Sequence, residues 1–271
     1  NNTAVGYNSL TANTTGAENT AVGRNALGTN TTASYNTAVG DQALNANTTG
    51  TRGVAVGNNA LNANTTGDYN IAIGDSALAS NTTADNNVAI GRNALVLNTT
   101  GASNTALGAL ALDANTTASN VTALGQASLT ANTTGGDNTA LGVSSLNDNT
   151  TGSNNTGTGV SSLRSCTTGT NNVGIGHQAG NDITTGSNNV CIGSDSDAAS
   201  ATTSNSITLG NSSISSLRCQ VQTISSLSDQ RDKTNIVDIA DGLELINNLR
   251  PRKFTWAMRE PSANDGTTHL G

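Results

Sequence analysis

The pentapeptide Asn-Thr-Ala-Val-Gly occupies residues 2–6, 19–23 and 36–40, at intervals of 17 residues. The same period continues without a slip from residue 2 to residue 205, which makes 12 copies. We number the positions of each copy from 1 to 17, beginning at Asn2. A spacing kept over so many copies argues against disorder and indicates a solenoid, in which each repeat stacks only on its neighbours.

Several positions of the repeat are held almost constant. Position 5 is always Gly, position 14 is always Thr, and position 9 is Leu in the first ten copies. Position 4 is Val, Ile or Leu in every copy except the one containing Thr158. Position 12 is Asn from Asn13 to Asn149 and is then replaced by other residues, namely Cys166, Ile183 and Ser200.

This pattern predicts β-coils. Seventeen residues are too few for a helix-turn-helix unit, and short Thr-Ala-Val segments broken by Gly and Asn-Thr-Thr-Gly are typical of strands and turns. We expect Gly at the corners, because only Gly adopts positive φ freely. Stacked Val/Ile and Leu ladders are expected to form a thin core, with Asn ladders hydrogen-bonded between coils. At about 4.8 Å per coil, the rod is expected to be roughly 58 Å long.

Composition excludes several classes of protein. Of 271 residues, 2% are aromatic and 11% are charged, whereas Asn and Thr number 40 and 43. So few large apolar side chains argue against a conventional enzyme core. The net charge of -7 argues against nucleic-acid binding, and no apolar run is long enough to insert into a membrane. Because the chain begins at Asn1 without Met, we expect a fragment or a processed product.

The composition changes near residue 227. Both Pro, both Lys, and the only Phe, Trp and Met follow this point. Such a change marks a domain boundary. We therefore predict 17-residue solenoid repeats over residues 1–205, a connecting β segment over 206–227, and a second domain that begins at 228.

A single coil of this kind buries little apolar surface, so we expect several chains to associate. We predict a homotrimer, intertwined or side by side, because association covers apolar surface and sheet edges. The repeat, which reads Asn-x-Ala-[Val/Ile/Leu]-Gly-x-x-Ala-Leu, resembles the head repeats of trimeric autotransporter adhesins. Their left-handed β-rolls pack in threes, and their repeat is shorter, so the resemblance covers the strand-and-turn unit.

Residues 227–236 read Leu-Ser-Asp-Gln-Arg-Asp-Lys-Thr-Asn-Ile. They resemble the start of the endosialidase-type intramolecular chaperone, which begins Ser-Asp-x-Arg-x-Lys-x-Asn-Ile. The following residues fit the same family: a capping box at Asp241 and Glu244, a helix ended by Pro251, and an alternating strand around Phe254. The family's domain is longer, so residues 228–271 are expected to be the beginning of a truncated α+β chaperone domain.

The resemblance implies that the protein is a viral tail fibre or tailspike whose C-terminal domain trimerises the chain and then cuts itself off. The scissile bond is Leu227–Ser228, with Ser228 as nucleophile and Lys233 as base. Supporting roles fall to the other residues that match the motif, Asp229, Arg231 and Asn235. The enzyme activity expected is at most a single-turnover serine endopeptidase, with no external substrate. Such a fibre is located on the virion, is extracellular when functional, and has a host-surface glycan or receptor as a possible partner.

Other features of the sequence give weaker predictions of function. No metal site is expected at His177 or His269, which have no Cys or carboxylate at ligand spacing, and no cofactor is expected. The three Cys, at 166, 191 and 219, lack a CxxC spacing, and the first two are expected to stack inside the rod. Two alternatives stay open. The Thr positions 13 and 14 suggest an ice-binding β-solenoid, and the chain can also be the non-catalytic part of a glycan-degrading tailspike.

Overall fold

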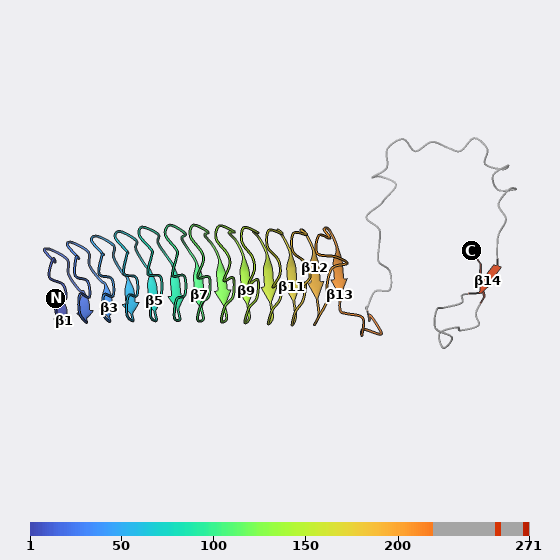
Figure 1. The fold of residues 1–271 in the computed structure, drawn as a ribbon, viewed down its shortest axis with the longest axis horizontal. Coiled ribbons are helices and arrows are strands. Elements are labelled where there is room, and N and C mark those ends of the chain that lie inside the picture. Colours follow the sequence, from blue (N-terminus) through green and yellow to red (C-terminus); the bar gives the residue numbers. More distant parts are fainter. Residues whose placement is uncertain (219–252, 256–267, 271) are drawn as a thin grey trace, which may run out of the picture. The chain divides into compact units, whose positions relative to one another are not determined.

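The computed structural model describes residues 1–218, 253–255 and 268–270. The chain divides into two compact units, Asn1–Ser216 and Leu217–Gly271. The first unit is a β-solenoid in which one short strand recurs in every coil (Figure 1). Its strands are β1 Thr3–Val5, β2 Thr20–Val22, β3 Thr37–Val39, β4 Val54–Val56, β5 Ile71–Ile73, β6 Val88–Ile90, β7 Thr105–Leu107, β8 Thr122–Leu124, β9 Thr139–Leu141, β10 Thr156–Thr158, β11 Val173–Ile175, β12 Val190–Ile192 and β13 Ile207–Leu209.

These strands form one parallel sheet in sequence order, β1 to β13. Each residue pairs with the residue 17 positions later, as Thr3 does with Thr20 and Val190 with Ile207. The predicted all-β solenoid with a 17-residue coil is therefore confirmed. Residues 1–218 contain no helix, so none of the described residues forms a helix that could cross a membrane.

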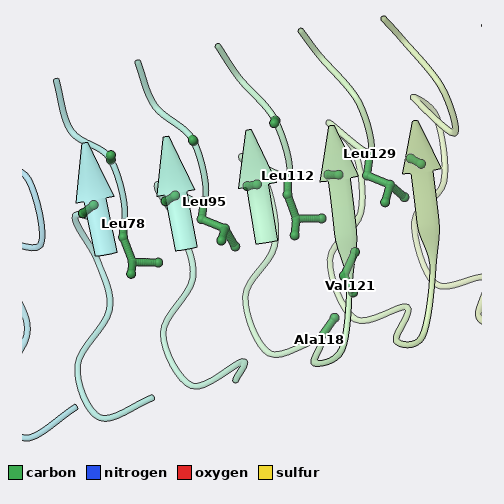
Figure 2. Close-up of a cluster of buried hydrophobic side chains, with 14 of the residues drawn as sticks. Leu78, Leu95, Leu112, Ala118, Val121 and Leu129 are labelled. Atoms are coloured by element: carbon green, nitrogen blue, oxygen red, sulfur yellow. The ribbon is translucent and has the colours of Figure 1, made fainter. Parts of the chain in front are cut away.

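The core is a narrow column of Ala and Leu. Ala at positions 3 and 8 and Leu at position 9 are fully buried in most coils, and Figure 2 shows the Leu ladder at Leu78, Leu95, Leu112 and Leu129. Neighbouring residues of a strand point to opposite faces. Position 4 therefore points away from the column that position 3 enters. The expectation that Val and Ile of position 4 belong to the core was wrong: Val39 is 37% exposed and Leu107 is 46% exposed.

The predicted Asn ladders are present and there are two of them. At position 12, the Asn30 Nδ2 donates to Asn13 Oδ1 over 2.9 Å, and the same contact repeats along the rod to Asn149. At position 1, the Asn19 Oδ1 accepts the backbone N–H of Asn36 over 3.0 Å. Both ladders are buried. Their hydrogen bonds satisfy amides that would otherwise be costly to remove from water.

The corners of the coil require left-handed backbone. Position 5 Gly has φ between +118° and +141° in coils 1 to 12, as predicted. A Cβ on Gly91 would lie 2.5 Å from the carbonyl oxygen of Gly108, so close stacking as well as φ selects Gly there. The Leu of position 9 also has positive φ, near +50°, from Leu10 to Leu163. The sequence gives no sign of this, since a branched side chain disfavours that region.

In the second unit, β14 Lys253–Thr255 pairs antiparallel with β15 Thr268–Leu270, and Phe254 is opposite His269. The strand predicted around Phe254 is thus present over three residues. The predicted helix before Pro251 lies outside the described residues.

Candidate functional surfaces and the cleavage motif

The predicted cleavage site lies outside the described residues. This applies to Leu227 and Ser228, to the proposed base Lys233, and to the supporting Asp229, Arg231 and Asn235. Their roles therefore stay predictions made from the motif. The surfaces of the solenoid, by contrast, are described in full, and three of them differ clearly in chemistry.

The first surface is the outer side of the sheet, formed by positions 2 and 4, which we call the strand face. Several strands are apolar at all three residues, such as Val54–Val56 and Ile71–Ile73. Parallel strands of this composition are normally covered on both sides. Here only the inner side is filled by the coil, and residues such as Ile175, 42% exposed, remain on the outer side. Position 4 forms an apolar row along the strand face that is interrupted at Thr158, whereas position 2 is Thr in seven strands and Val or Ile in six. The single chain does not cover this row.

The second surface consists of the two edges that border the strand face, at positions 17 and 6. On the first edge, the Arg52 guanidinium lies 5.4 Å from the ring of Tyr35 and 5.3 Å from that of Tyr69, and it donates to the Tyr69 hydroxyl over 3.1 Å. On the second edge, Arg24 Nη2 pairs with Asp41 Oδ2 over 2.6 Å. Charged and aromatic side chains thus gather at these edges, a feature that sequence reasoning missed.

The third surface carries the two threonine rows. At position 13, hydroxyls bond to the next coil, as Thr31 Oγ1 does to the carbonyl of Thr48 over 3.1 Å. At position 14, the Thr residues are exposed in all copies. Only one of the two rows therefore presents its hydroxyls outward, and the other serves the stacking of coils.

The remaining candidate residues do not assemble into a reactive site. Burial raises the pKa of Cys166 to about 11 and also raises the pKa of Cys191, so both thiols are held neutral inside the rod. His177 is exposed and lies 3.7 Å from Asp195. Among the described residues, no group of three His, Cys, Asp or Glu is placed to hold a metal ion.

Comparison with known protein families gives a match within the second unit. Residues 228–271 match the family described as chaperone of endosialidase. No curated protein and no solved structure matches the chain. The match begins at Ser228, the residue that the motif predicts as the first of the domain. The chain therefore joins a β-solenoid of 17-residue repeats to a C-terminal segment that matches the chaperone of endosialidase.

Proposed function

We propose that this chain is the shaft of a viral tail fibre, built as a homotrimer and assembled by a C-terminal intramolecular chaperone that cleaves itself off. The observation that carries the proposal is the chaperone match at residues 228–271, directly after a regular solenoid. A chaperone of this kind is needed where a chain cannot find its partners alone. A repeated shaft with an uncovered apolar stripe is such a chain.

The strand face supports the trimer. A row of Val, Ile and Leu at position 4 that runs from β1 to β13, interrupted at Thr158 and partly exposed, is rare on a monomer and is covered by association. With three strand faces turned toward a common axis, the position 4 residues of each coil meet in one layer. They then form a second core, outside the Ala and Leu column of each chain.

The cleavage follows from ordinary nucleophile chemistry. The Lys233 amine removes the proton from Ser228 Oγ, which attacks the carbonyl carbon of Leu227. The Leu227–Ser228 amide becomes an ester as its nitrogen takes a proton, and water then hydrolyses the ester to a Leu227 carboxylate. For Lys233 to act as a base, its pKa must be lowered, and a positively charged neighbour such as Arg231, two residues away in the sequence, would act in that direction. Loss of the chaperone leaves the shaft kinetically trapped, because refolding would need the missing template.

The test is to express the protein to the natural end of its reading frame, unchanged and as Ser228→Ala, and to weigh the products. We expect the unchanged protein to give a piece ending at Leu227 and the variant to stay whole. An unchanged protein that stays whole, or a variant cut at the same bond, would refute the assignment of Ser228. Light scattering on the released shaft tests the trimer separately, and a one-chain mass would refute it.

The exposed threonine row gives one observation in favour of ice binding. Its hydroxyls are regularly spaced and face outward. Ice binding gives no reason for a segment that matches the chaperone of endosialidase. A single row of threonines also offers little surface area for contact with ice. A shaft that binds ice would show thermal hysteresis in solution. We expect the shaft to show none. A sugar-cleaving role is tested by incubating the shaft with host-surface polysaccharide, which we expect to remain intact while binding stays possible.

A further inference from the structure

The position 12 ladder ends inside the solenoid. From Asn30 to Asn149, the Nδ2 of each amide donates to the Oδ1 of the amide one coil earlier, over 2.7–3.2 Å. In coil 10 the same position holds Cys166. The Asn149 Oδ1 is buried and receives no hydrogen bond from any residue that the structure describes. The ladder therefore runs through coils 1 to 9 and stops there.

The thiol of Cys166 cannot replace an amide at this position. One amide makes two bonds, as Asn149 Nδ2 does to Asn132 Oδ1 over 2.7 Å and to the carbonyl of Gly152 over 3.0 Å. A thiol has a single weak donor, and Cys166 Sγ directs it to the carbonyl of Gly169, 3.7 Å away. The bond to the preceding coil is lost. Because a buried acceptor without a partner is costly, the contact between coils 9 and 10 is weakened.

The position 1 ladder tolerates replacements that the position 12 ladder does not. Its Oδ1 atoms accept a backbone N–H of the next coil, which every residue except Pro supplies. Gly53 and Val121 replace Asn at position 1, yet their N–H groups still donate to Asn36 Oδ1 over 2.7 Å and to Asn104 Oδ1 over 3.0 Å. This ladder also continues past coil 10. Coils 10 to 12 thus keep one of the two ladders.

The same coils also depart from the repeat in the apolar column. Gly157 and Gly174 replace Ala at position 3, which removes a buried methyl group from coils 10 and 11. The Leu column of position 9 ends at Leu163, because coil 11 has Gly180 there. Ile183, at position 12 of coil 11, is fully buried and fills part of that space: a Cβ on Gly180 would lie 3.5 Å from Ile183 Cδ1. Apolar packing is partly kept, whereas the amide ladder is not.

We propose that the solenoid consists of two sections that open separately, residues 2–154 (coils 1 to 9) and residues 155–205 (coils 10 to 12), and that the second section opens first. In an array where each repeat contacts only its neighbours, a weak contact between two repeats divides the array into separate cooperative units. The proposal rests on contacts within one chain and needs neither the trimer nor the cleavage. In the proposed assembly, the coils that precede the chaperone match in the sequence can open and close without unfolding the rest of the shaft.

Hydrogen exchange of the full chain tests the division by comparing coil 3 with coil 10, residues 36–52 and 155–171. Each is the third of the 12 coils counted from its own end, so fraying from the ends affects the two alike. We expect residues 155–171 to exchange at least about tenfold faster, because of the unpaired acceptor, and residues 172–205 to exchange at least as fast. Exchange in coil 10 that is equal to or slower than that in coil 3 overturns the proposal.

Thiol labelling tests whether coils 10 to 12 open as one unit. Cys166 and Cys191 are free and fully buried, in coils 10 and 12, so each reacts only when its coil opens. Cys219→Ser removes the third thiol. With an aromatic disulfide as the reagent, we expect the two thiols to be labelled at the same rate within about threefold. Labelling of Cys191 while Cys166 stays protected would mean that the coils fray one by one from the end, and it overturns the proposal.

Cys166→Asn tests the ladder as the cause of the division. The added amide can donate to Asn149 Oδ1 and to the carbonyl of Gly169, whereas Ile183, the next residue at position 12, has no amide to donate to it. The boundary is therefore expected to move by one coil.

In this variant, we expect residues 155–171 to exchange about tenfold more slowly than in the unchanged protein, while residues 172–205 stay fast. Cys166→Ala removes the thiol without adding an amide. It is the matched control and is expected not to slow exchange. If coil 10 exchanges no more slowly with Asn than with Ala at this position, the ladder does not set the boundary and the proposal is overturned. The comparison of coils 3 and 10 and the thiol labelling need neither variant.

Discussion

Replacement of Asn98 by alanine is expected to destabilise the coils around it by roughly 3–6 kcal/mol. Asn98 is fully buried in the position 12 ladder. Its Nδ2 donates to Asn81 Oδ1 over 3.2 Å and to the carbonyl of Gly101 over 2.9 Å, and its Oδ1 accepts from Asn115 Nδ2 over 2.8 Å. Three hydrogen bonds at about 1 kcal/mol each give the lower figure.

The upper figure comes from the groups left behind. The Gly101 carbonyl keeps the amide of Asn87 as a donor, over 3.0 Å. Asn115 keeps the carbonyl of Ala118 as an acceptor, over 3.1 Å. Asn81 Oδ1 has no other donor within the described residues, so it is left buried and unpaired, which costs about 1–3 kcal/mol.

Hydrogen exchange followed by mass spectrometry is the suitable assay. A repeat array opens locally, and exchange reports the free energy of that opening coil by coil. Because 1.4 kcal/mol is a factor of ten, a loss of 3 kcal/mol corresponds to exchange about 100-fold faster near residues 81–120. Thr100→Ala, on the exposed row two residues away, is the control and is expected to change exchange by about twofold or less.

Equal exchange in the two variants, within threefold, would refute the reasoning. The ladder would then add nothing to the stability of the rod, and the Ala and Leu column alone would hold the coils together. Replacement of the buried Asn98 would then cost no more free energy than a substitution at an exposed position.

Three further predictions follow from the same contacts. Gly91→Ala, whose Cβ would lie 2.5 Å from the Gly108 carbonyl oxygen at φ +133°, is expected to cost at least about 2 kcal/mol in the same exchange assay. Ile73→Asp with Leu107→Asp on the strand face is expected to give one-chain species in light scattering, because the two carboxylates would be buried in the proposed trimer. Thr66→Asp with Thr100→Asp, on the exposed threonine row, is expected to keep the three-chain mass. Cys166, with a pKa raised to about 11 by burial, is expected to react with iodoacetamide at pH 8 about 100-fold more slowly than a free thiol. Because the folded state holds this proton more tightly, Cys166 also makes stability fall between pH 9 and pH 11, and Cys166→Ala is expected to reduce that fall.

Much of the solenoid could be predicted from the sequence because the repeat is strict. When every coil has 17 residues, residues of the same type lie directly above one another and form a ladder. The Gly of position 5 and the Asn of position 12 have one chemical use in a stacked coil, and both behave as expected. The Leu of position 9 was placed in the core but not in left-handed backbone. Its φ follows from the need to close a 17-residue coil around a narrow column, which no local preference of Leu reveals.

The assignment of position 4 to the core failed for a related reason. Val39 is larger and more apolar than the adjacent Ala38, so size alone favours Val39 inside. The two residues must point to opposite faces, however, and the column already holds Leu44. A small residue fits opposite that Leu, such as Ala38 here and Gly157 opposite Leu146, so the larger side chain is turned outward. The cleavage site is a different case, because its chemistry rests on the motif from Ser228 to Asn235 and on the family match at residues 228–271.

The regularity that makes the shaft easy to predict also makes it hard to assemble. Each coil contacts only its neighbours and nearly repeats their sequence, so three chains displaced by one coil lose a single layer of contacts out of twelve or so. Position 4 of the strand face is Val, Ile or Leu in every strand except β10, so apolar contact alone does not oppose such a displacement. In the proposed assembly, the C-terminal chaperone breaks this degeneracy, because it would align the three chains before the coils close. Once the coils are stacked, the Asn ladders hold each chain in its own coils and the strand faces hold the three chains of the proposed trimer together, so removal of the aligning domain is expected to leave the assembly intact.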